Sequence, residues 1–200
     1  MKVIGITGGI SSGKTTICNF LEKKNFPIHD SDLVVKDIYK KAPQKLLVTL
    51  KKIGLSHSVK NKKINKNIIR NELFNNKSKK KILENYFHNE VRKSREKFLK
   101  KHKAKKTKIV ILDIPLLFEA KLLYVCDYII LLYAPQKVKI KRAIKRKGMT
   151  KEMVLKILKA HISDTYKKKK SHYTVNTTKT KNSSFKTVLN IINNIIYNNA

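Results

Sequence analysis

One segment near the start of the chain constrains the fold more than any other. Residues 8–15 read Gly-Gly-Ile-Ser-Ser-Gly-Lys-Thr, which fits the pattern G-x-x-x-x-G-K-[ST] of a phosphate-binding loop. Such a loop points backbone N–H groups at phosphate oxygens, and the following helix adds partial positive charge at its N-terminus. A chance glycine turn is the alternative. The context disfavours it, because residues 3–7 form a β-branched apolar run and helical spacing follows Lys14.

The residue types in this loop have distinct expected tasks. Lys14 is expected to reach the β- and γ-phosphates of ATP, and the hydroxyl of Thr15 to ligate Mg²⁺. Backbone and side-chain groups around them complete the nucleotide site. These further nucleotide-binding residues are Gly8, Ser11, Ser12, Gly13 and Thr16.

Apolar runs and helical patterns alternate along the chain, which predicts an α/β fold with a mostly parallel sheet of about five strands flanked by helices. Beyond residues 3–7, the expected strands are 26–29, 108–112, 128–133 and 173–175. Two basic helices are expected between residues 137 and 169, meeting at Gly148 with Thr150 as an N-cap. A last amphipathic helix begins near Ser184.

The pattern also predicts three parts with different tasks. Residues 33–106 are polar, lysine-rich and helical in pattern, with the clearest helix from about 78 to 99, and they are expected to form an inserted helical subdomain. Residues 136–171 are expected to form a helical lid. The nucleotide-binding core then comprises residues 1–32, 107–135 and 172–200.

Polar clusters follow three of the expected strands. Because ligands of parallel sheets bind beyond the carboxyl ends of strands, the phosphate loop, Asp30-Ser31-Asp32 and residues 113–119 are expected around one crevice. The Asp-x-Asp is expected to face the phosphate loop across adjacent strands, where Asp32 could accept the proton of an attacking hydroxyl. The alternative is that these aspartates only form a turn or cap a helix.

Other candidate side chains carry explicit alternatives. Asp113, which closes an apolar strand, is expected to serve either the magnesium shell or the substrate, and Glu119 could instead be a solvated helix residue. Arg142 and Arg146 are spaced i, i+4 and so share a helix face, where they could neutralise a transferring phosphoryl group or form a solvated basic face. His88 is by default a core or surface residue.

Charge is the unusual feature of the composition. Lys and Arg number 47 against 13 Asp and Glu, a net charge of +34. This excess suggests a polyanion partner, but it is mostly lysine spread along the chain, as AT-biased coding DNA also produces. No apolar run reaches the roughly 18 residues of a membrane-spanning helix, and the two cysteines lack metal or disulfide spacing. These features favour a cytoplasmic protein without a specific nucleic-acid or membrane partner.

Taken together, these segments resemble the dephospho-CoA kinase family over most of the chain. The resemblance is carried by Gly5–Ile10, Ser12–Thr15, Asp30–Asp32, His88, Val91, Arg92, Asp113–Glu119, Gln136, Arg142 and Arg146. It implies transfer of the γ-phosphate of ATP to the ribose 3′-hydroxyl of dephospho-CoA, the last step of coenzyme A biosynthesis. It also implies a five-stranded parallel sheet, with block 33–106 as the substrate-binding domain.

The resemblance further implies roles for single residues. Asp32 matches the catalytic base, and Arg142 matches the lid arginine near the transferring phosphate, with Lys14 as the third catalytic residue. Arg146 would contact the nucleotide. The substrate-binding residues would be Asp32, His88, Arg92, Asp113, Leu116 and Glu119.

Some positions depart from the family pattern. The family usually has glycine at Ser11, proline at Asn89 and glutamine at His161, and it ends the fifth strand with acidic residues and an asparagine, where this chain has different residues at 172–177. Ser11 is expected to be tolerated if its φ is not forced positive. The changes at 172–177 bear on the adenine contacts.

Two other functions remain open from the sequence. Another small-molecule P-loop kinase, acting on a nucleoside or nucleotide, would share the phosphate chemistry and differ in block 33–106. A basic nucleic-acid-binding ATPase would explain the charge, but the lysines are not interleaved with aromatic residues. We expect a monomer whose partners are ATP and a small-molecule acceptor.

Overall fold

The computed structural model describes residues 1–61, 63–74 and 76–197. The chain divides into two compact units. The first comprises Met1–Asp30 and His102–Ala200, and the second Ser31–Lys101. Each unit has its own hydrophobic core.

The first unit is built on a parallel sheet. In the described part of the chain this sheet has five strands in the order β2-β5-β1-β6-β7, and all its pairings are parallel. The apolar β-branched runs explain the central strands, since strands buried on both faces need no polar alternation. The strands are β1 (Lys2–Gly8), β2 (Ile28–Asp30), β5 (Ile109–Asp113), β6 (Tyr128–Tyr133) and β7 (Tyr173–Asn176). The predicted five-stranded parallel sheet is therefore confirmed.

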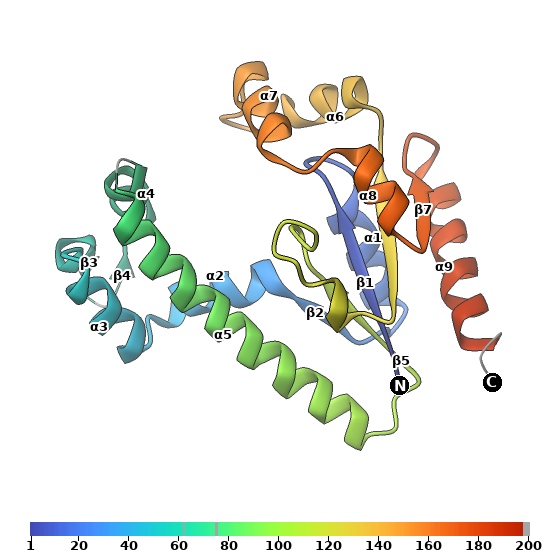
Figure 1. The fold of residues 1–200 in the computed structure, drawn as a ribbon, viewed down its shortest axis with the longest axis horizontal. Coiled ribbons are helices and arrows are strands. Elements are labelled where there is room, and N and C mark those ends of the chain that lie inside the picture. The colour runs from blue at the N-terminus through green and yellow to red at the C-terminus, as the bar shows by residue number, and fades with distance from the viewer. Residues whose placement is uncertain (62, 75, 198–200) are drawn as a thin grey trace. The chain divides into compact units, whose positions relative to one another are not determined.

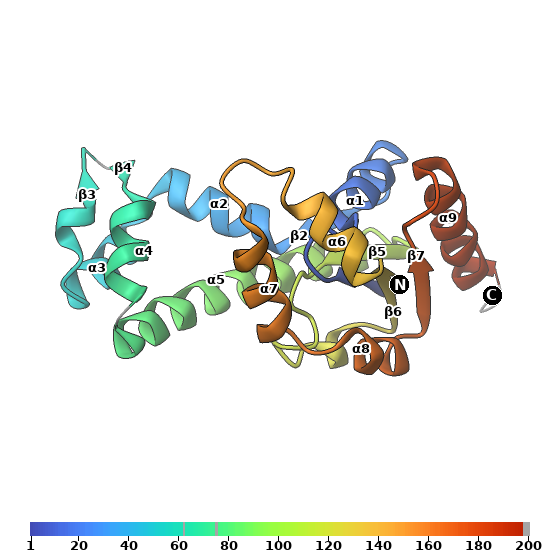
Figure 2. The same cartoon turned by 90° about the horizontal axis from the view of Figure 1, so that it is seen from above.

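Helices cover both faces of this sheet. Helices α1 and α9 lie on one face and α8 on the other (Figure 2). The first two are joined by stacked rings of Phe20 and Phe185, whose centroids are 4.1 Å apart. Leu21, Val188 and Ile192 pack beneath them against Ile4. The helices are α1 (Lys14–Lys23), α6 (Gln136–Ala143), α7 (Lys151–Ala160), α8 (Asp164–Lys170) and α9 (Lys181–Tyr197).

The basic segment after β6 differs from its prediction. Two helices were expected between residues 137 and 169, but α6, α7 and α8 share this span. Thr150 caps α7 as expected, because its hydroxyl accepts a hydrogen bond from the Met153 amide. The additional break falls at His161–Ser163, where Ser163 caps α8 through the Tyr166 amide. Figure 1 shows α6, α7 and α8 in the yellow to orange part of the chain.

The second unit is mostly helical and also contains one short pair of strands that the sequence pattern did not predict. Residues Val59–Lys60 (β3) and Lys63–Ile64 (β4) form an antiparallel pair preceded by a 3₁₀ turn at Ser56–Ser58. Its helices are α2 (Ser31–Lys41), α3 (Gln44–Lys52), α4 (Lys66–Phe74) and the long α5 (Lys77–Ala104). The core of this unit contains Leu46, Leu50, Leu55, Ile69, Leu83, Tyr86 and Phe87.

Among the described residues, no helix combines the length and apolarity needed to traverse a lipid bilayer.

Candidate functional site

The phosphate loop connects β1 to α1. Gly8 is the last residue of β1, and α1 begins at Lys14. Gly13 has φ 89°, in the left-handed region that favours glycine. At Gly8 a Cβ atom would lie 2.4 Å from Ser12 Oγ and 2.6 Å from the Leu132 carbonyl oxygen, so the loop passes too close for a side chain. The side-chain oxygens of Ser11 and Ser12 are buried without a hydrogen-bond partner among the described residues.

Ser11 has φ 54°. The sequence argument tolerated serine here only if its φ was not forced positive, and the structure shows that it is positive. A non-glycine residue in this region is strained by about 1 kcal/mol or more. The buried, unpartnered hydroxyl of Ser11 adds to this cost.

We therefore expect Ser11→Gly to raise the free energy of unfolding by about 1 kcal/mol, since relief of strain exceeds the extra entropy of an unfolded glycine. For a chain of this size this is a rise of about 2–4 °C in the midpoint of thermal unfolding. Ser12→Gly is the matched control, because it also removes a buried hydroxyl but lies outside the left-handed region, so it should raise stability less than Ser11→Gly does. A thermal unfolding midpoint of Ser11→Gly that is equal to or lower than that of Ser12→Gly would contradict the strain at Ser11.

Lys14 contacts a buried carboxylate. Its ammonium donates to Asp113 Oδ1, and the Asp113 side chain is only 4% exposed. Burial raises the pKa of Asp113, although the charge of Lys14 acts in the opposite direction. Burial, together with the charge of Asp113, also raises the pKa of the Cys18 thiol, which is hydrogen-bonded to this carboxylate. Cys18 is thus protonated at neutral pH, and Asp113 fixes the lysine at the carboxyl end of the sheet.

The two aspartates of the Asp-x-Asp fall in different elements. Asp30 ends β2 and is in register with Asp113 of β5, which in turn is in register with Ile6 of β1. The expectation that β2 is adjacent to β1 is therefore wrong, because β5 lies between them. Asp32 is an exposed residue in the first turn of α2 and belongs to the second unit.

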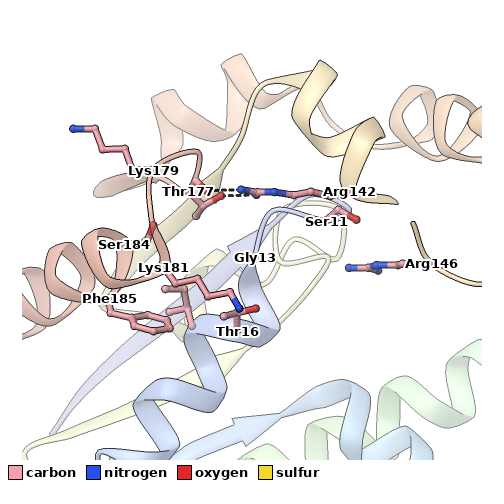
Figure 3. Close-up of a pocket in the computed structure, with 11 residues that line it drawn as sticks. Ser11, Gly13, Thr16, Arg142, Arg146, Thr177, Lys179, Lys181, Ser184 and Phe185 are labelled. Atoms are coloured by element: carbon pink, nitrogen blue, oxygen red, sulfur yellow. Dashed lines mark hydrogen bonds between the residues drawn. The ribbon is translucent and has the colours of Figure 1, made fainter. Parts of the chain in front are cut away.

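A pocket of about 230 Å³ opens beside the phosphate loop. Arg142 and Arg146 both line it, but α6 ends at Ala143 and Arg146 lies in the turn that follows. The prediction that the two arginines share one helix face is therefore wrong, although one pocket brings them together (Figure 3). The other lining residues are Ser11, Gly13, Thr16, Ile17, Thr177, Lys179, Lys181, Ser184 and Phe185.

The residues from Thr177 to Phe185 were not among the predicted site residues. Thr177 follows β7 directly, and its oxygens accept hydrogen bonds from both terminal nitrogens of the Arg142 guanidinium. The rule that places polar clusters at strand ends would have identified it, because the carboxyl end of β7 lies beside that of β6.

A second group of buried charges lies between the loop after β5, α6 and α8. Glu119 Oε1 accepts hydrogen bonds from Lys167 Nζ at 2.7 Å and from the Ile162 amide at 3.1 Å. Lys139 Nζ donates to Asp164 Oδ2 at 2.5 Å. The side chains of the two lysines are only 2% and 5% exposed. Glu119 lies in a turn and is half-buried, so the reading of it as a solvated helix residue is wrong.

These contacts set the pKa of two groups. Burial alone raises the pKa of Glu119, but the hydrogen bonds and charge of Lys167 outweigh it and hold the pKa below its ordinary value of 4.5. Burial lowers the pKa of His161, and the charges of Lys167 and Lys139 add to this effect. The Glu119–Lys167 pair therefore ties α8 to the loop after β5 with both partners charged.

Glu119→Gln is expected to lower the free energy of unfolding by about 3 kcal/mol at pH 7, because it leaves the Lys167 ammonium buried without its counter-charge. A lowered pKa contributes stability at pH above the ordinary value and loses it as pH falls through the lowered value. The difference between the two proteins should therefore be constant from pH 7 to about 5 and narrow below 4.5.

Urea unfolding at several pH values measures this difference. Glu22→Gln is the control, since Glu22 is exposed on α1 of the same unit and its neutralisation should change stability by less than about 0.5 kcal/mol. A difference for Glu119→Gln that grows as pH falls would have the wrong sign for this ion pair.

The remaining predicted residues take simple positions. His88 and Arg92 are exposed and one turn apart on α5, where Arg92 approaches Glu96 at 3.9 Å. Leu116 is 44% exposed in the loop after β5. Thr15 and Thr16 are exposed in the first turn of α1.

Oxygen atoms suitable for a hard cation gather at the same edge of the sheet. Thr15 is the second residue of α1, and Asp113 is the last residue of β5. Mg²⁺ prefers such ligands and usually takes one or two of them together with phosphate oxygens and water. Among the described residues, no group of three or more His, Cys, Asp and Glu side chains could hold a metal by itself. The donor set thus fits a magnesium ion that arrives with a nucleotide.

Comparison with known proteins identifies the family. A family model described as dephospho-CoA kinase matches residues 2–182. The dephospho-CoA kinase of Fusobacterium nucleatum is 35% identical over 173 residues, which are 86% of each chain. That of Bartonella quintana is 31% identical over 198 residues, covering 99% of this chain and 100% of the relative.

Solved structures share the fold. The dephospho-CoA kinase from Campylobacter jejuni aligns with a TM-score of 0.73 and 25% identity, covering 99% of this chain and 98% of that one. TT1252 from Thermus thermophilus gives a TM-score of 0.80 at 24% identity, over 96% and 95% of the two chains. Since the family model and both relatives span most of the chain, this protein belongs to the dephospho-CoA kinase family.

Proposed function

We propose that this protein transfers the γ-phosphate of ATP to the ribose 3′-hydroxyl of dephospho-CoA, giving coenzyme A and ADP. The observation that carries the proposal is the phosphate loop with Lys14 held on Asp113 at the carboxyl end of the sheet, in a chain of the dephospho-CoA kinase family. In the reaction, a bond forms between the 3′-oxygen and the γ-phosphorus while the bond from that phosphorus to the β,γ-bridging oxygen breaks. The hydroxyl proton leaves to a base.

The nucleotide would occupy the loop and the pocket beside it. Backbone N–H groups of the loop and the N-terminus of α1 would bind the phosphates. Lys14 would stabilise the negative charge that develops on the transferring phosphoryl group. In the structure its ammonium contacts Asp113. Arg142 and Arg146 line the pocket with Thr16 and Phe185. Arg146 would contact the nucleotide, and Arg142 would stabilise the charge of the transferring phosphoryl group.

The acceptor would be activated by Asp32. This carboxylate stands two residues after Asp30, the end of the strand that pairs with β5, and it is exposed to incoming substrate. As a base it would take the 3′-hydroxyl proton. The helical unit that begins at Ser31 would bind the acceptor, with His88 and Arg92 on one face of α5. Leu116 would add an apolar contact from the loop after β5.

Mg²⁺ is proposed as the accompanying ion, held through Thr15 and neutralising charge on the β- and γ-phosphates. Residues 136–171 are proposed to act as a lid, Asp113 to contribute to the metal or the substrate, and Glu119 to border the acceptor site. We further propose that the protein works in the cytoplasm as a monomer with small-molecule partners.

A substrate panel tests this function. With ATP and Mg²⁺, dephospho-CoA should be converted to a product that carries one additional phosphate, and nucleoside monophosphates should not be phosphorylated. Phosphorylation of a nucleoside monophosphate with dephospho-CoA untouched would instead identify a nucleotide kinase. ATP hydrolysis that requires added nucleic acid and falls steeply with salt would identify the nucleic-acid-dependent ATPase that the net charge of +34 suggests.

A further inference from the structure

Thr177 forms hydrogen bonds with three parts of the first unit, namely the end of β6, the phosphate loop and the Arg142 side chain. It is 6% exposed, directly after β7. Its amide donates to the Tyr133 carbonyl at 2.9 Å, which fixes its backbone to the end of β6. Its side chain also lies against the phosphate loop, since a Cβ atom on Gly13 would be 3.6 Å from Thr177 Cβ.

The hydroxyl of Thr177 has one proton and two possible acceptors. The Ser12 carbonyl oxygen lies 2.8 Å away and the Tyr133 carbonyl oxygen 3.3 Å away. The Ser12 oxygen lies at the ordinary O–H···O distance and the Tyr133 oxygen beyond it, so the proton goes to Ser12. The hydroxyl thereby donates to the Ser12 carbonyl of the phosphate loop, and its oxygen can accept a hydrogen bond from another group.

Arg142 uses this acceptor. Its Nη1 donates to Thr177 Oγ1 at 3.2 Å and its Nη2 to the Thr177 carbonyl oxygen at 2.6 Å. The guanidinium therefore meets two oxygens of one residue, as the dashed lines of Figure 3 show. A two-point contact fixes the plane of a guanidinium as well as its position. The chain Arg142–Thr177–Ser12 thus links the arginine to the phosphate loop.

We propose that Thr177 is a positioning residue, which sets the Arg142 guanidinium against the phosphate loop through its hydroxyl. This inference rests on the proposed function, in which Arg142 stabilises the transferring phosphoryl group. Misplacement of such a group by about 1 Å can lower turnover by about 100-fold. Position 177 lies in the segment where this chain departs from the family pattern.

Three variants test it. Thr177→Val replaces the hydroxyl with a methyl group of similar size, and we expect kcat to fall about 10- to 100-fold while KM for ATP changes less than about threefold. Thr177→Ser keeps the hydroxyl and should retain kcat within about threefold. Thr178→Val is the control at unchanged kcat, because Thr178 is exposed and its hydroxyl donates to Asn176 Oδ1 at 2.8 Å, away from Arg142.

A double-variant comparison links the effect to Arg142. Arg142→Ala should lower kcat. Adding Thr177→Val to it should lower kcat no further, since both changes remove the same hydrogen bond between Arg142 and the Thr177 hydroxyl. Wild-type kcat in Thr177→Val, or losses that multiply in the double variant, would overturn the proposal.

A readout without turnover separates this inference from the kinase assignment. With ¹⁵N-labelled arginine, the Arg142 signals, assigned by their loss in Arg142→Ala, should show hindered guanidinium rotation in wild type and Thr177→Ser. Thr177→Val should show faster rotation than wild type, because the Nη1 hydrogen bond to the hydroxyl is lost while the Nη2 hydrogen bond to the backbone carbonyl oxygen is kept. If wild type fails to phosphorylate dephospho-CoA, the proposed function is wrong. Rotation that is as slow in Thr177→Val as in wild type would independently rule out the positioning role of the hydroxyl.

Discussion

Replacing Lys14 with alanine is expected to lower phosphoryl transfer from ATP by about 10³-fold or more, which in most assays is complete loss. The reason is that Lys14 supplies the side-chain cation inside the phosphate loop, and cations aimed at the transferring group contribute about 10²- to 10⁵-fold to turnover. In the structure this ammonium is held by Asp113, whose side chain is 4% exposed.

Stopped assays over a range of ATP concentrations measure this loss. Lys23→Ala is the matched control, since Lys23 is exposed in the last turn of the same helix and should leave kcat unchanged. Lys14→Ala also leaves Asp113 buried without its lysine partner, which could destabilise the protein. The thermal unfolding of each variant is therefore measured to establish that the variant is folded. Lys14→Met, which keeps an unbranched apolar stem, provides a second variant. A folded variant at position 14 with more than a tenth of wild-type turnover would contradict the role of this lysine.

Asp32→Asn is expected to lower kcat by about 10²- to 10⁴-fold with little change in KM for ATP. An amide is nearly isosteric with the carboxylate but cannot accept the hydroxyl proton, and a positioned general base contributes about this much. The alternative for an aspartate in the first turn of α2 is a favourable interaction with the helix dipole, which contributes to stability by about 1 kcal/mol or less and not to turnover.

Asp37→Asn separates these two roles, since Asp37 is exposed on the same helix. It should retain wild-type kcat, and Asp32→Asn should retain most of its stability while losing turnover. Wild-type turnover in Asp32→Asn would assign Asp32 to the helix alone, and another group would have to take the proton.

The strands and the phosphate loop were predictable because their signals are local. The apolar run at residues 3–7 and the glycines that follow it specify β1 and the loop by themselves, and residues 128–133 match β6. The order of strands is a different matter. Hydrophobic periodicity does not record which strand is the neighbour of which, so the insertion of β5 between β1 and β2 could not be derived from it.

Long-range contacts explain what the sequence did not reveal. The break before α8 coincides with a hydrogen bond from the Ile162 amide to Glu119, a residue 43 positions earlier. Glu119 also selects Lys167 from a run of four lysines, and nothing in that run distinguishes the buried member. The contact between Thr177 and Ser12 spans 165 positions. Only the Ser163 cap carried a local signal for the helix break, in the sequence Ser-Asp after Ile162.

The strain at Ser11 could likewise not be derived from the sequence pattern alone. The sequence pattern marked the position, but the sign of its φ decides whether a serine is strained there, and that angle depends on the whole turn from Gly8 to Gly13. The strain does not touch the ion pair of Lys14 with Asp113. A chain with this loop can therefore keep its phosphate chemistry while losing about 1 kcal/mol of stability.

The position of the new phosphate tests the central claim most directly. Wild-type protein is incubated with γ-labelled ATP, Mg²⁺ and dephospho-CoA, and the purified product is treated with a 3′-nucleotidase, which removes 3′-phosphate groups. We predict that one labelled phosphate is incorporated per dephospho-CoA and that the 3′-specific treatment releases it completely. Label that is absent from dephospho-CoA, or that resists 3′-specific release, would contradict the proposed reaction.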